Sequence, residues 1–176
     1  MNLSGLVVWL ARMLAILGGI VLVLITVLTV VSIGGRSLIS LGLRPIPGDF
    51  ELVEVGTGFA VFAFLPWCQL VRGHATVDLF ATFFPASVNR LIDLVTELLM
   101  TAVIVLVAWR LWYGMLDKIR YQETTFILQY PVWWGYAAAM AALVVAVIVS
   151  FYMLFIRIRE FATGRTILGS GQGAFH

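Results

Sequence analysis

The stretch PVWWGYAAAMAALVVAVIVSFYMLFIR, residues 131–157, carries no charged side chain before its closing arginine. It exceeds the ~20 apolar residues that an α-helix needs to cross ~30 Å of bilayer hydrocarbon. Trp133, Trp134 and Tyr136 stand near its start, and such rings favour the headgroup level of a membrane. Because a segment in lipid must satisfy its own backbone hydrogen bonds, residues 132–156 predict a transmembrane helix.

Three further apolar runs precede this one. They cover about residues 13–33, 52–71 and 91–113, and none shows the two-residue alternation of a membrane β-barrel. Pro66 lies inside the second run, where it frees a backbone carbonyl and is expected to bend the helix. We therefore predict an all-α integral membrane protein in which residues 1–176 form a single membrane domain with four transmembrane helices.

The composition agrees with a lipid bilayer as the surroundings. Hydrophobic residues make up 62% of the 176 residues and charged residues 11%, against about 25% charged in a typical soluble domain. Eleven Lys/Arg against nine Asp/Glu give a formal charge of +2, which is too small to indicate nucleic-acid binding.

The basic residues that flank the spans predict the orientation. With four spans, one side of the membrane holds both termini and the middle connector, and it carries Arg12, Arg72, Arg90, Arg157, Arg159 and Arg165. The other side carries Arg36, Arg44, Arg110, Lys118 and Arg120. Because Lys and Arg favour the cytoplasmic side, this small excess predicts cytoplasmic termini.

The middle connector has an amphipathic pattern. Val77, Phe80 and Phe84 recur at helical spacing with polar residues between them, which predicts a short helix over about residues 75–85 in the membrane interface.

The last connector and the tail are less regular. The third span is expected to continue as a helix to about Thr124, after which the apolar residues 126–128 need cover from lipid or from a partner. The Gly/Ser-containing tail, residues 164–176, is expected to be flexible.

The candidate functional residues are the charges near the span ends: Glu51, Glu54, Arg90, Asp93 and Glu97. An ionisable group inside a membrane is by default a candidate for ion or proton handling. Glu97 lies only about 10 Å beyond Arg90 along the helix, however, and a helix start favours acidic side chains. Arg90, Asp93 and Glu97 also occupy neighbouring helical positions. We favour structural pairing or subunit contact for these residues, with ion transport as the alternative.

No pattern indicates catalysis, a cofactor or a metal. Cys68 is the only cysteine, so it cannot form an internal disulfide. A haem held in the membrane would need histidines within the spans, whereas His74 and His176 lie outside them. No phosphate-binding glycine loop is visible, nor a nucleophile with a neighbouring base. We expect no enzymatic activity.

Residues 48–80, GDFELVEVGTGFAVFAFLPWCQLVRGHATVDLF, resemble the small permease subunit of tripartite ATP-independent periplasmic (TRAP) transporters. The resemblance is carried by Pro66, by Arg72-Gly73-His74 with the following Val77-Asp78, and by Pro131 before the tryptophan pair. It covers most of residues 10–160, and the four predicted spans agree with it.

The resemblance implies a role in sodium-driven secondary transport, or symport, at a bacterial inner membrane. In that family a large membrane subunit moves the substrate by an elevator-type motion, and a soluble periplasmic protein delivers it, often an organic acid. The small subunit is implied to be a static scaffold without a substrate or ion site. We interpret Arg72, His74 and Asp78 as structural residues at the cytoplasmic interface, with a proton relay through His74 as the alternative.

Two other functions are compatible with four apolar helices. One is a membrane anchor or assembly subunit of a respiratory or other complex, which bound haem or quinone would identify. The other is a self-contained small exporter, which transport by this chain alone would identify.

Overall fold

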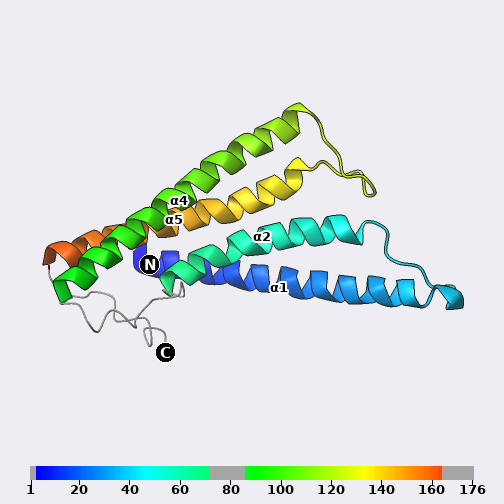
Figure 1. Cartoon of the computed structure of the whole chain (residues 1–176), viewed down its shortest axis with the longest axis horizontal. Helices are drawn as coiled ribbons and strands as arrows, with labels where there is room; N and C mark the ends of the chain where they lie inside the picture. The colour runs from blue at the N-terminus through cyan, green and yellow to red at the C-terminus, as the bar shows by residue number, and fades with distance from the viewer. Residues whose placement is uncertain (1–2, 72–85, 164–176) are drawn as a thin grey trace.

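Four long helices dominate the computed structural model, which describes residues 3–71 and 86–163 (Figure 1). In chain order the described elements are α1 (Leu3–Ser37), the short 3-10 helix η1 (Ile39–Leu41), α2 (Asp49–Leu70), α4 (Ala86–Arg120) and α5 (Trp133–Thr163). Each of the four α-helices is long and apolar enough to cross a membrane. The predicted all-α membrane fold with four transmembrane helices is therefore confirmed.

The helices pair into two hairpins, α1 with α2 and α4 with α5, and α2 also packs on α5 (Figure 1). The hairpins lie together where α2 and α5 end and α4 begins, which we call the closed end. They diverge toward the opposite end, where α1 and α4 end and α2 and α5 begin, which we call the open end.

Small residues allow α1 and α2 to approach each other closely. A Cβ atom added at Gly18 of α1 would lie 2.9 Å from the Cβ atom of Ala63 in α2. One added at Gly56 of α2 would lie 2.7 Å from Cγ2 of Ile25 in α1. Helix association in lipid depends on such close van der Waals packing. Lipid tails are as apolar as the side chains, so the hydrophobic effect does not favour contact between the helices.

Helix α5 contributes more buried residues than any other described helix. Its buried residues recur every three or four positions and so form one helical face: Ala139, Ala142, Leu143, Ala146, Val149, Ser150, Met153, Ile156 and Glu160. By contrast, α1 exposes apolar side chains such as Val23, Leu24 and Val30. An apolar surface of this kind suits lipid contact, since the hydrocarbon core of a bilayer is equally apolar.

Helix α4 ends earlier than its sequence predicts. It stops at Arg120 rather than near Thr124, because Gln122 adopts a positive φ of 49° that a helix cannot continue through. The chain then turns back through an isolated bridge between Thr124 and Pro131.

Pro66 lies buried inside α2, and the helix runs on past it to Leu70. The predicted interfacial helix at residues 75–85, the residues Arg72, Gly73, His74, Val77 and Asp78, and the tail at 164–176 all lie outside the described residues.

Candidate functional site

A buried glutamine joins the two hairpins near the closed end. Nε2 of Gln69, in the last turn of α2, donates a hydrogen bond to Oε1 of Glu97 in α4 over 2.6 Å. The Ser150 hydroxyl of α5 donates to Oε1 of Gln69 over 2.7 Å. Gln69 is 3% exposed and Ser150 is fully buried. One side chain thus connects three helices, and both ends of its amide have partners.

These hydrogen bonds give partners to three polar side chains that lie within the membrane-spanning helices: Gln69, Glu97 and Ser150. A polar group in an apolar interior costs free energy unless it is hydrogen-bonded. Gln69 donates to the Glu97 carboxylate, and Ser150 shares its single hydroxyl proton between Gln69 and the Ala146 carbonyl of its own helix, 2.8 Å away. Thr101, one turn beyond Glu97, is buried, and its hydroxyl has no partner within the described structure.

A second polar cluster lies further toward the closed end. Nη1 of Arg157 in α5 contacts Asp93 of α4 at 2.9 Å and Glu160 of its own helix at 3.0 Å. The Arg157 and Glu160 side chains are only 12% and 4% exposed. A buried charge is stable only with a well-placed partner, so this trio holds α4 against α5.

The structure separates the charges that the sequence groups on one face of α4. Asp93 pairs with Arg157, and Glu97 pairs with Gln69. Arg90 belongs to α4, and its side chain lies outside the described part of the chain.

Near the open end, Glu51 attaches the connector between α4 and α5 to the start of α2. Its two carboxylate oxygens accept hydrogen bonds from the backbone amides of Ile127, over 2.6 Å, and Leu128, over 2.9 Å. The Tyr130 hydroxyl donates to the Glu51 carbonyl over 3.3 Å. The attached connector leaves the Phe126 side chain 97% exposed.

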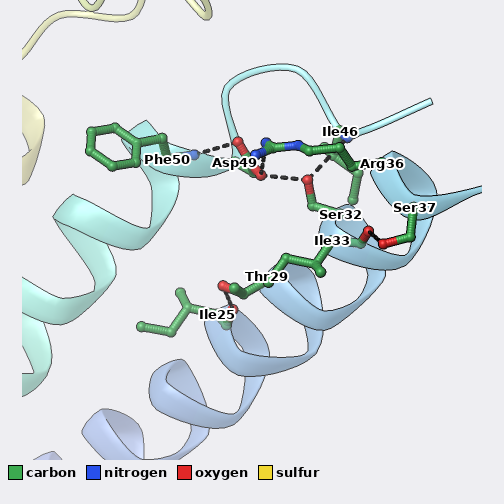
Figure 2. A network of polar contacts seen from close by, with 9 residues as sticks. All are labelled: Ile25, Thr29, Ser32, Ile33, Arg36, Ser37, Ile46, Asp49 and Phe50. Atoms are coloured by element: carbon green, nitrogen blue, oxygen red, sulfur yellow. Dashed lines mark hydrogen bonds and ion pairs between the residues drawn. The ribbon is translucent and has the colours of Figure 1, made fainter. Parts of the chain in front are cut away.

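A separate network joins α1 to the start of α2 (Figure 2). The Ser32 hydroxyl, fully buried in α1, donates a short hydrogen bond to the Asp49 carboxylate and accepts one from the Ile46 amide over 3.3 Å. Arg36 adds a weak contact to Asp49 at 4.0 Å. Asp49 also accepts from the Phe50 amide over 2.8 Å in the first turn of α2.

A cavity of about 490 Å³ lies between the hairpins on the open side. α2, α4, α5 and the connector between α4 and α5 all contribute to its lining, which includes Glu54, Phe62, Leu111, Tyr130 and Tyr136. Burial raises the pKa of the Tyr130 phenol, and the nearby charges of Glu51 and Glu54 raise it further. The Glu54 side chain is exposed and has no hydrogen-bond or ion-pair partner among the described residues.

Sequence reasoning did not single out Gln69, Ser150 or Glu160, and it used Arg157 only to predict orientation. A signal was present for Gln69 and Ser150, because an uncharged polar residue in an apolar span commonly hydrogen-bonds to another helix. For Arg157 and Glu160, their three-residue spacing indicated a pair on one helix face.

The chemistry of these clusters is that of hydrogen bonding and ion pairing. Among the described residues, no group of three or more His, Cys, Asp or Glu side chains is placed to hold a metal ion.

Comparison with protein families agrees with this membrane architecture. Residues 25–160 match the family described as tripartite ATP-independent periplasmic transporters, DctQ component. Neither the comparison with curated proteins nor that with solved structures gives a match. The matched region spans α2, α4, the last 13 residues of α1 and most of α5, well over half of the sequence. The chain therefore belongs to the DctQ family, the small membrane component of TRAP transporters.

Proposed function

We propose that this chain is the static scaffold of a sodium-driven TRAP transporter that takes up organic acids across a bacterial inner membrane. The observation that carries the proposal is the position of Gln69 between Glu97 and Ser150. A moving domain requires an anchored frame, and hydrogen bonds that join three helices through one side chain oppose relative motion of those helices.

The position of Asp93 supports the same role. The carboxylate of Asp93 is paired with Arg157, which leaves less of its charge available to a transported ion. Structural pairing is thus the better proposal for Asp93 and Glu97 than ion transport.

The partners in this proposal are a large membrane subunit and a periplasmic substrate-binding protein. Both termini face the cytoplasm, and the open end, with Phe126 at its surface, faces the periplasm. Arg72, His74 and Asp78 have a structural role at the cytoplasmic interface, where Arg72 can contact lipid phosphates.

Substrate uptake in proteoliposomes tests the scaffold role. The experiment uses the complete set of subunits, scans the sodium concentration, and normalises the rate to the amount of assembled complex. The variant Glu97→Gln removes the charge but keeps a side chain that can hydrogen-bond to Gln69. We expect it to lower the amount of complex or to leave uptake nearly normal, with unchanged sodium dependence.

A different sodium stoichiometry in Glu97→Gln would contradict the scaffold role, as would a complex that assembles fully but does not transport. Purification from native membranes in mild detergent gives an independent test. A larger membrane protein should co-purify, whereas a stable chain without any second membrane subunit would count against the proposal.

A further inference from the structure

The cavity between the hairpins changes in polarity along its length. Its outer part contains the Glu51 and Glu54 carboxylates and the Tyr130 hydroxyl. Glu54 lies five residues into α2, or about 7–8 Å along the helix axis. The deeper wall is apolar, with Phe62 about 20 Å along α2 and Leu111 about 13 Å from the end of α4.

The outer part of the cavity has an uncompensated negative charge. Glu51 is engaged by two backbone amides, while Arg36 is engaged at Asp49 and Lys118 at Glu123. Arg44 and Arg120 are exposed, and neither forms an ion pair with Glu51 or Glu54 in the described structure. Glu54 has no such partner among the described residues, and the lining of the cavity includes no basic side chain. Because charges at membrane depth are normally paired, Glu54 favours a cation supplied from beyond the described residues.

Aromatic rings line the same cavity as this carboxylate. Phe50, Phe126, Tyr130 and Tyr136 line the cavity together with Glu54. Aromatic faces attract cations electrostatically, and cages of such rings recognise alkylated ammonium groups. A carboxylate with several rings therefore favours an organic ammonium over a strongly hydrated metal ion.

The cavity is polar in its outer part and apolar in its deeper part, and this order favours a phospholipid as the source of the ammonium group. Exposed Tyr121, just after α4, and Trp134, at the start of α5, mark the headgroup level of the bilayer. A phospholipid presents its ammonium group at this level and its acyl chain beneath it, in the same order as the cavity. The volume of about 490 Å³ is within the range of sites for small ligands, roughly 300–1,000 Å³.

We propose that this cavity binds a membrane phospholipid with an ammonium headgroup, with Glu54 as the counter-charge and the apolar wall along an acyl chain. The site goes beyond the scaffold role and does not depend on sodium coupling or on the transported substrate.

Two variants test the two halves of the site. Glu54→Gln removes the counter-charge and keeps the size of the side chain. Gly58→Leu fills the apolar part, because Gly58 lines the cavity and a Cβ atom added there meets nothing within 4 Å. Asp117→Asn is the matched control, since Asp117 is an exposed carboxylate near the same end of the bundle and is not part of the cavity lining.

The measurement is native mass spectrometry of the full chain released from bilayers of equal phosphatidylethanolamine and phosphatidylglycerol. We expect wild type and Asp117→Asn to retain phosphatidylethanolamine in preference to phosphatidylglycerol. In Glu54→Gln this preference should fall about two- to fivefold, the strength of an ammonium–carboxylate or cation–π contact at a partly exposed site. In Gly58→Leu both lipids should be retained less. Circular dichroism checks that each variant is folded, and Gly58→Leu remains decisive if Glu54→Gln fails to fold.

Equal retention of the two lipids by wild type would overturn the proposal, as would an unchanged preference in folded Glu54→Gln. The same measurement on the complex with its large subunit separates lipid from protein. If phosphatidylethanolamine is absent from that complex and Glu54→Gln prevents assembly, the cation is a basic side chain of the partner, and the lipid proposal is wrong.

Discussion

The Nε2 atom of Gln69 lies 2.6 Å from Oε1 of Glu97 and donates a hydrogen bond to it across the boundary between the two helical hairpins. The two residues are 28 positions apart in sequence, Gln69 on α2 and Glu97 on α4. Gln69 makes its other hydrogen bond to Ser150 of α5. This contact joins the hairpins at the depth where α2 ends, so its loss should loosen their packing.

We expect Gln69→Leu to destabilise the chain by about 1–3 kcal/mol, because it leaves the Glu97 carboxylate without its donor in an apolar setting. Thermal unfolding in detergent is the measurement. Thr26→Val is the control, since the Thr26 hydroxyl is exposed and bonds only to its own helix. The double variant Gln69→Leu/Glu97→Leu should recover part of the loss, and an equal or larger loss would contradict this account.

The attachment of the connector by Glu51 should be visible in hydrogen exchange. In Glu51→Ala the amides of Ile127 and Leu128 lose a charged acceptor, so we expect them to exchange about tenfold faster or more. Glu54→Ala is the matched control, because Glu54 lies one turn away and accepts neither amide proton. Unchanged exchange in Glu51→Ala would show that other contacts hold the connector.

Two adjacent glycines of α1 should differ sharply in their tolerance of a side chain. Gly18→Val should destabilise the chain by about 1–3 kcal/mol, because an added Cβ atom would already lie 2.9 Å from Ala63. Gly19→Val should have a much smaller effect, since nothing lies within 4 Å of a Cβ atom there. Unfolding of both variants under the same detergent conditions provides the comparison, and similar losses would contradict the close packing of α1 on α2.

Arg157 should matter far more than Arg159. Arg157→Gln leaves the nearly buried Glu160 without this partner, and removing one member of a buried ion pair costs about 3–5 kcal/mol. Arg159 is exposed and lies over the Phe155 ring at 5.7 Å, so Arg159→Gln should cost less than about 1 kcal/mol. The yield of folded protein from membranes, with the midpoint of thermal unfolding, measures the difference. Equal effects would show that Glu160 is held by other contacts.

Cysteine accessibility tests the orientation. Cys68 is first replaced, and a single cysteine is then placed at Ser40 or Gln122, both exposed at the open end. With cytoplasmic termini, a membrane-impermeant reagent should label both positions from the periplasm. Labelling from the cytoplasmic side alone would reverse the predicted orientation.

The sequence by itself determined the number of membrane-crossing helices and where they lie. Hydrophobicity and length act locally, so a run such as residues 132–156 must become a helix in lipid whichever neighbours it has. The same reasoning placed Glu51 near the start of its helix, but Glu97 lies eleven residues, or about 16 Å, into α4, because that helix begins at Ala86. Sequence reasoning did not predict that α4 ends at Arg120, because the backbone at Gln122 is set by the turn that returns the chain to α5.

Only the tertiary structure decided which polar groups meet. Helical spacing along α4 grouped Asp93 and Glu97 on one face, yet their partners Arg157 and Gln69 come from two other helices. A pairing between helices depends on their relative translation and rotation, which arise from close packing at positions such as Gly18 and not from any local pattern. For the same reason, the sequence could name Glu54 as a membrane charge, while only the arrangement of α2, α4 and α5 creates the cavity that it lines.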